Sequence, residues 1–307
     1  MISWIKKYAR IFKKTFARFF QGEPMSHSAS IAFYTIFSMP AILIISLVIA
    51  GSFYEDAQVK SLMMNQIQEM FGKESASQVL KIMENANQQT DDTIAKIIGI
   101  GTLVFSATTV FVSLQDSLNH IWRIKPKPKH GIIGFLVNRA LSLAMVVSIG
   151  FLLLVSLIID ALLVVFNDFL RDVLFGHTFY IISGLNLIVS LGVITVIFAI
   201  IYKVLPDARV KWRDVWVGAF VATLLFNLGK YLMSIYMATS TLATAYGAAG
   251  SLVLLLVWVY YSAIILLFGA EFTFVYSQEI GEVIKPSKRA VRLEIKEIEK
   301  TNDSQNN

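Results

Sequence analysis

The stretch SLVLLLVWVYYSAIILLFGAEFTFVY, residues 251–276, decides the fold. It contains one charged side chain, Glu271, which lies near its end. A helix that crosses the hydrocarbon core of a bilayer needs about 20 mostly apolar residues. This stretch is therefore predicted to be a transmembrane helix.

Five further segments pass the same test, at residues 31–53, 94–114, 141–166, 181–204 and 215–237. The whole chain agrees with them, because 56% of its 307 residues are hydrophobic and only 16% are charged. A soluble surface needs more charge than this, and intrinsic disorder needs low hydrophobicity. We expect an all-α polytopic membrane protein whose six transmembrane helices occupy residues 25–280.

Lys and Arg are concentrated on one side of the predicted membrane domain. They gather in residues 1–20, 123–139, 203–213 and 285–300. The opposite connections carry only Lys60, Lys73, Lys81 and Arg171. Because short cytoplasmic loops are rich in Lys and Arg, both termini are predicted to be cytoplasmic. The net charge of +6 then reflects topology and contact with anionic lipids rather than nucleic acid.

Three segments flank or interrupt the spans. Residues 1–24 are amphipathic and basic and are predicted to form a helix in the cytoplasmic interface, as an anchor or as a recruiting surface. Residues 55–92 are predicted to form a small helical segment on the outer face, as a covering or as a lid. Residues 281–307 form a charged cytoplasmic tail, in which we expect a short helix followed by a frayed end. We expect no removable signal peptide, since no small-residue cleavage site follows the first span.

Ionisable residues inside spans are costly and suggest function. Asp160 and Lys230 lie at similar depth below the outer surface, so they either form a pair or extend separately to the interface. A second group lies at the inner ends of the spans. It could bind an anionic head group or gate a cavity, or it could be a structural ion-pair network, and its members are Gln115, Asp116, Asn119, Arg139 and Glu271.

Backbone features add three expectations. Pro40 should kink the first span, because proline removes a helical hydrogen bond. Gly218 and Ala222 form a small-residue face suited to close helix packing. The uncharged connection at residues 239–253 either re-enters the membrane or forms a tight helical hairpin.

Several kinds of catalytic chemistry have no signature in the chain. It has no cysteine, its four histidines show no metal-ligand spacing, and no P-loop or nucleophile motif is present. We therefore expect no metal, no cofactor, no ATP hydrolysis and no enzymatic activity.

Four segments resemble the motifs of the YihY/virulence factor BrkB family over roughly residues 10–280. They are AFYTIFSMPAILII, SLQDSLNHIWRIK, YKVLPDARVKWRDVWVGAF and the region from TAYGAAG to EFTFVY. The resemblance implies a six-span bacterial inner-membrane protein linked to the cell envelope, for which a permease or lipid-export role has been proposed. The family once carried the name ribonuclease BN, now regarded as a misassignment, and the missing nuclease chemistry agrees with that. The motif positions are Tyr34, Pro40, Asp116, Asn119, Trp122, Pro206, Tyr246, Gly247 and Glu271.

Taken together, these features favour a permease for an amphipathic or anionic envelope molecule. Its substrate-binding or coupling residues would be Asp116, Asn119, Arg139, Lys230 and Glu271, with Asp160 as the partner of Lys230. The alternative is a non-catalytic scaffold for envelope maintenance. The expected partners are membrane lipids, including anionic lipids at the cytoplasmic face, and a second copy of the chain.

Overall fold

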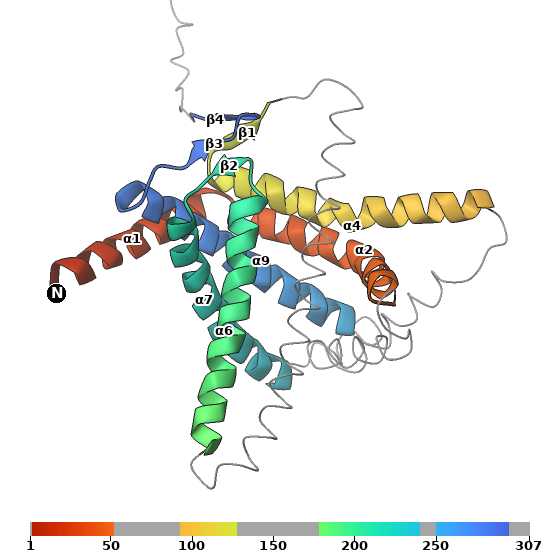
Figure 1. Ribbon diagram of the computed structural model, residues 1–307, viewed down its shortest axis with the longest axis horizontal. Helices are drawn as coiled ribbons and strands as arrows, with labels where there is room; N and C mark the ends of the chain where they lie inside the picture. The colour runs from red at the N-terminus through yellow and green to blue at the C-terminus, as the bar shows by residue number, and fades with distance from the viewer. Residues whose placement is uncertain (1, 52–92, 128–177, 240–249, 295–307) are drawn as a thin grey trace, which may run out of the picture.

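The computed structural model describes residues 2–51, 93–127, 178–239 and 250–294, which are mostly helical (Figure 1). The helices are α1 (Ile2–Gln21), α2 (Pro24–Gly51), α4 (Thr93–Ile121), α6 (Thr178–Val204), α7 (Trp212–Thr239) and α9 (Gly250–Glu279). The strands are β1 (Ile124–Pro126), β2 (Ala208–Arg209), β3 (Lys285–Pro286) and β4 (Ala290–Arg292).

Five of the predicted spans coincide with helices, namely α2, α4, α6, α7 and α9. The predicted span at residues 141–166 and the predicted outer segment at residues 55–92 lie outside the described residues. Helix α4 continues two turns past its predicted end and includes Gln115, Asp116 and Asn119. Within the described part, Trp212–Tyr236 and Leu252–Glu279 are long and apolar enough to cross a bilayer.

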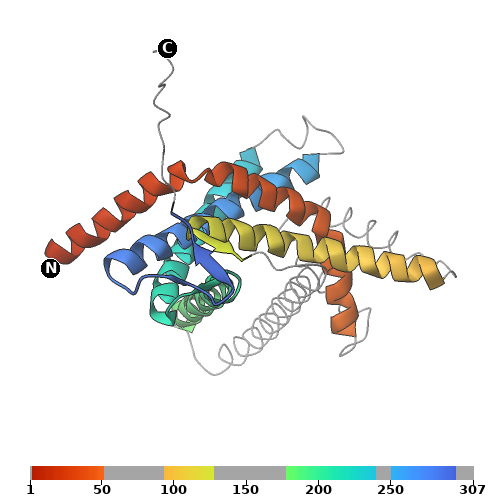
Figure 2. The same cartoon turned by 90° about the horizontal axis from the view of Figure 1, so that it is seen from above.

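Helix α9 lies at the centre of the described structure. Helices α1, α2, α4 and α7 all pack against it, and Figures 1 and 2 show it running between them. Its last third is largely enclosed by protein, since residues 270–277 are all buried and Ala270 and Val275 are fully so. A helix that is apolar on all sides is suited to such a central position.

Small residues allow α7 to approach α9 closely. A Cβ atom added at Gly218 would lie 1.8 Å from Thr273 Oγ1, and one at Gly269 would lie 2.6 Å from the Cβ of Ala222. The predicted small-residue face of Gly218 and Ala222 is therefore confirmed as a packing surface against α9. The hydroxyl of Tyr202, from α6, also lies 2.3 Å from the Cβ position of Gly269, so three helices meet there.

Two small antiparallel sheets close one end of the helices. Strand β1 follows α4 and pairs with β4, so that Ile124 lies opposite Arg292. Strand β2 follows α6 and pairs with β3, so that Ala208 lies opposite Pro286. The fold is therefore mostly helical rather than all-α.

The predicted helix at the start of the charged tail is wrong for residues 285–294, which form β3, β4 and their flanks. The reason is strand pairing with segments that are distant in the sequence. The chain leaves α4 and α6 in extended segments with unpaired backbone groups, and the tail satisfies those groups. Ile284 and Ala290 are also buried there, which a solvated helix would not achieve.

Helix α1 has the predicted amphipathic character, but its apolar side is divided in two. Ile11 and Phe19 are buried against α9, and the ring of Phe19 lies 5.3 Å from that of Phe268. Phe16 and Phe20 remain exposed. One part of the apolar side thus packs against protein, and the other part is exposed at the surface.

Helix α2 changes direction along its length. Figure 2 shows its orange final part turning away from its first part. Pro40 lies within this helix. The change of direction agrees with the kink that the sequence predicts for this span.

The contacts at Gly269 predict a selective effect of alanine substitution. Gly269→Ala should lower the stability of the protein by about 1–3 kcal/mol, because the new methyl group overlaps rigid neighbours. Gly192→Ala on α6 is the matched control, since no described atom lies within 4 Å of its Cβ position. It should leave stability unchanged or raise it by up to about 1 kcal/mol through helix propensity. Thermal unfolding of both variants in detergent measures this, and equal melting temperatures would contradict the packing described here.

Candidate functional site

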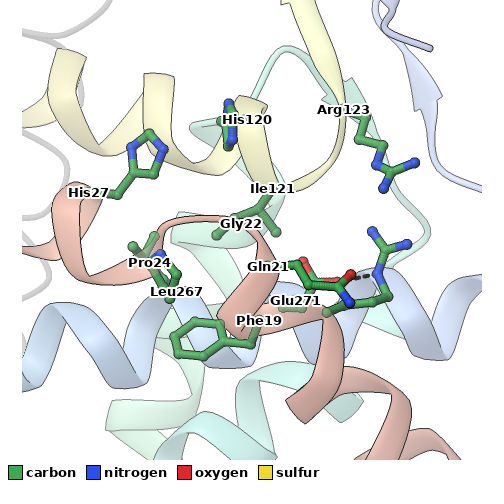
Figure 3. A pocket seen from close by; sticks show the side chains of 11 residues that line it. Phe19, Gln21, Gly22, Pro24, His27, His120, Ile121, Arg123, Leu267 and Glu271 are labelled. Carbon is green, nitrogen blue, oxygen red and sulfur yellow. Dashed lines mark hydrogen bonds and ion pairs between the residues drawn. The ribbon is translucent and has the colours of Figure 1, made fainter. Parts of the chain in front are cut away.

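A pocket of about 110 Å³ lies where the α1–α2 turn, the end of α4 and helix α9 meet (Figure 3). A buried water needs roughly 10–15 Å³ by this measure, so the pocket has room for a small polyatomic group. Its lining residues are Arg18, Phe19, Gln21, Gly22, Pro24, His27, His120, Ile121, Arg123, Leu267 and Glu271.

An ion pair crosses the pocket between α1 and α9. Arg18 Nε donates a hydrogen bond of 2.6 Å to Oε1 of Glu271, which is only 4% exposed. The guanidinium of Arg18 also lies 4.8 Å from the ring centre of Phe274. A buried carboxylate requires such a partner, because an unpaired charge away from water is strongly destabilising.

A second guanidinium, that of Arg123, faces the same region. Figure 3 shows the side chain of Arg123 directed toward the part of the pocket that holds Glu271, and its positive charge acts on that carboxylate. The guanidinium makes no hydrogen bond or ion pair with any residue in the described part of the chain. The pocket therefore contains two arginines and one carboxylate.

The backbone of Arg123 is unusual. Its φ of 54° places it in the left-handed region at the end of α4, where glycine is the usual residue. Glu23, in the turn between α1 and α2, has φ of 51°. Both strained positions therefore flank this pocket.

Two histidines line the other side of the pocket. The rings of His27 on α2 and His120 on α4 lie 4.7 Å apart between centroids. Burial and the nearby His120 lower the pKa of His27, and Glu23 opposes this shift. A lowered pKa keeps His27 neutral at pH 7, so the positive charge of the pocket comes from the arginines.

A separate polar network links α4 to the segment between α6 and β2. Oδ2 of Asp207 accepts hydrogen bonds from Gln115 at 3.2 Å and from Asn119 at 3.1 Å. In return, the backbone N–H of Asp207 donates to Oδ1 of Asn119 at 2.8 Å. This network fixes the end of α6 against the end of α4.

Asp116 lies beside that network. The residue as a whole is exposed, but its carboxyl is partly shielded from water. This shielding and the negative charge of Asp207 raise the pKa of Asp116.

The structure divides the predicted inner cluster into two sites. Glu271 pairs with Arg18 in the pocket, whereas Gln115 and Asn119 bind Asp207. Arg139 lies outside the described residues.

The other predicted residues fall in different places. Lys230 is exposed on α7, and its predicted partner Asp160 lies outside the described residues, so this pair stays a prediction. Tyr34 is exposed on α2. Tyr246 and Gly247 also lie outside the described residues.

Two motif residues have clear structural roles. Trp122 is buried at the end of α4, and its Nε1 donates a hydrogen bond of 3.0 Å to the carbonyl of Ala270 on α9. Pro206 is buried directly before Asp207.

Sequence reasoning missed four residues of these sites. In the sequence, Arg18 is one of several basic residues of an amphipathic segment, and Arg123 is one of several in a basic loop. Asp207 and His27 carried no spacing signal. The available hint was the position of Arg18. It lies four residues after Lys14 and next to Phe19, beside the apolar stripe of the helix.

The described residues offer no metal site. Within residues 2–51, 93–127, 178–239 and 250–294, no group of three His, Asp or Glu side chains could hold a metal ion. The chemistry available in the pocket is therefore charge and hydrogen bonding from two arginines, two imidazoles and a carboxylate.

Comparison with known proteins agrees with these long apolar helices. The chain is 29% identical to a UPF0761 membrane protein of Alteromonas mediterranea, over 79% of each chain. It is 30% identical to one of Pseudoalteromonas translucida, over 72% of this chain and 67% of the relative. A relative in Legionella pneumophila is 25% identical over 87% of this chain and 62% of the relative. The protein is thus a mostly helical membrane protein.

Residues 15–294 match the family model of virulence factor BrkB. The chain therefore belongs to the virulence factor BrkB family, as the motif resemblance predicted. No solved structure shows a significant match to the chain.

The raised pKa of Asp116 predicts that Asp116→Asn stabilises the protein at neutral pH. The folded state binds this proton more tightly than the unfolded state, so stability falls as pH rises toward the folded pKa. The variant removes that penalty, and its advantage should shrink as pH falls through the folded pKa. Thermal unfolding of wild type and variant from pH 4 to pH 8 measures the difference.

Asp207→Asn is the matched comparison and should lower the melting temperature, because its carboxylate accepts two side-chain amides. A pH-independent loss of stability in Asp116→Asn would contradict the electrostatic explanation.

Proposed function

We propose that this protein is a six-span protein of the bacterial inner membrane that binds and moves an amphipathic or anionic envelope molecule without ATP hydrolysis. The observation that carries the proposal is the pocket between α1, α4 and α9, lined by Arg18 and Arg123. Small-molecule sites in helical proteins often lie between helices, where a few placed polar groups fix the orientation of the ligand.

The proposed topology places this pocket at the cytoplasmic face, with both termini on the same side. Support comes from the position of the basic segments. The end of the structure that holds the pocket also holds the basic segments. These are helix α1, strand β1 after α4 and strand β2 after α6 (Figure 1). Lys and Arg enrichment of short segments marks the cytoplasmic side.

The surroundings of the pocket suit a molecule that approaches from the membrane. Phe16 and Phe20 are exposed in the last turns of α1, next to the α1–α2 turn that borders the pocket, and Phe33 and Phe37 are exposed further along α2. Exposed aromatic rings beside basic residues are typical of helices at the membrane interface. We infer that α1 contacts anionic lipids and that a lipid-like substrate can reach the pocket along this side.

A non-catalytic scaffold is the second candidate. It is favoured by an exposed apolar stripe along one face of α7, formed by Trp216, Phe220, Leu224 and Leu228. In a scaffold this stripe would contact another protein or a second copy, and in a transporter it would contact lipid.

Flux in proteoliposomes tests the transport proposal. The full chain is reconstituted, and movement of fluorescent anionic and zwitterionic phospholipids between leaflets is followed by chemical quenching, with and without a proton gradient. We expect faster movement of the anionic probe with wild type, and at least a tenfold loss with Arg18→Gln. Lys13→Gln, on the exposed side of the same helix, is the control and should keep wild-type flux.

A double variant, Arg18→Gln with Glu271→Gln, separates function from folding. It removes both charges and can keep a hydrogen bond, so the fold should survive while flux stays low. Restored flux in this variant would show that the pair is only structural. Absence of flux in wild type, together with a specific co-purifying protein, would favour the scaffold.

A further inference from the structure

We propose that the pocket recognises a terminal phosphate group, free or as a monoester, with Arg123 as the main recognition residue and Arg18 beside it. This inference rests on the proposed function, because it names the chemistry of the molecule that the pocket would take. The same group could belong to a lipid head group or to a soluble phosphate.

The charge of the pocket supports an anionic ligand. Arg18 is paired with Glu271 at 2.6 Å, whereas the guanidinium of Arg123 has no partner among the described residues. Helix α2 begins at Pro24 on the edge of the pocket, and the start of a helix carries partial positive charge. The two arginines and the start of α2 therefore attract an anion, and the carboxylates of Glu271 and Glu23 offset part of that positive charge.

The position of Arg123 is fixed more firmly than a solvated arginine requires. Its backbone N–H donates to the carbonyl of His120 at 3.0 Å, and its carbonyl accepts from the N–H of Leu293 at 2.8 Å. These bonds tie it to α4 and to the tail beyond β4. They hold it at φ 54°, where a residue without Cβ would be more stable. A strained backbone that places a side chain in a pocket indicates that the side chain has a use.

The donor geometry favours phosphate over a simple halide. A guanidinium presents its N–H groups as a planar fork that matches two oxygens of a phosphate. Figure 3 shows His27 and His120 at the other end of the pocket, with Ile121 and Gly22 between them and the arginines, so the arginines supply the recognition. The pocket of about 110 Å³ holds several times the volume that one water needs.

Binding measurements on the full-length protein test this inference without requiring flux. The probes are inorganic phosphate, followed by thermal shift in detergent, and phosphatidic acid in nanodiscs, compared with the diester phosphatidylglycerol. A bound ligand raises the melting temperature as its concentration exceeds Kd. We expect stabilisation by phosphatidic acid, by inorganic phosphate or by both, and a weaker effect of the diester.

Substitutions at position 123 provide the decisive comparison. Arg123→Gln should weaken binding at least tenfold, and Arg123→Lys should weaken it less, because it keeps the charge but loses the fork. Arg123→Gly removes the side chain at a backbone conformation that glycine prefers, so it should fold normally and fail to bind. Lys125→Gln, an exposed lysine on β1, is the matched control and should bind like wild type.

Each result has a defined meaning. Binding of phosphatidic acid alone indicates a lipid source, and binding of inorganic phosphate indicates that free phosphate also enters. Absence of binding by both probes, or equal binding by Arg123→Gly and Lys125→Gln, would overturn the inference. Binding that depends on Arg123 without any flux would sustain the inference and contradict transport.

Discussion

The enclosure of the last third of α9 is the constraint on which the other elements depend. A helix with protein on every side has no solvated face on which to place a charge, and yet Glu271 lies there. Burial of an unpaired carboxylate costs several kcal/mol, so a cation must reach it. Helix α1 supplies Arg18, and its exposed Lys14 binds Glu279 at 2.5 Å. These two ion pairs fix the position of α1 along α9. The α1–α2 turn is fixed with it, and that turn forms one wall of the pocket.

The opposite wall is held from the far end of the chain. Strands β3 and β4 pair with the segments that follow α6 and α4, so the tail joins the ends of both helices. The hydrogen bonds of Asp207 to Asn119 reinforce the same junction. Arg123 lies at this junction, between α4 and β1. The geometry of the pocket therefore depends on residues that are far apart in sequence but share one structural end of the molecule.

The sequence predicted what local apolar runs determine and missed what tertiary pairing determines. Long apolar segments predicted five helices, and the spacing of Gly218 and Ala222 predicted a close helix contact, whose partner the structure shows to be α9. The tail was predicted as a helix, because its alternating charges also suit a solvated helix and its strand partners are distant in sequence. The sequence predicts one polar site at the inner ends of the spans. Similar depth in the membrane does not show which of the helices that carry these residues are neighbours. Arg18 was missed for the same reason, since only the packing of α1 on α9 gives it a carboxylate partner.

The location of the pocket limits the mechanism that it can support. It lies at the end of α1, the start of α2 and the end of α4, beside Leu267 and Glu271 in the second half of α9. A site at that level suits the head group of a molecule whose apolar part stays among lipids or along exposed rings such as Phe16 and Phe20. Two residues beside the pocket, Glu23 and Arg123, have left-handed backbone conformations, which the protein maintains at a cost in stability. Such preorganisation favours selective capture at the membrane surface, and any movement across the membrane must begin from that capture step.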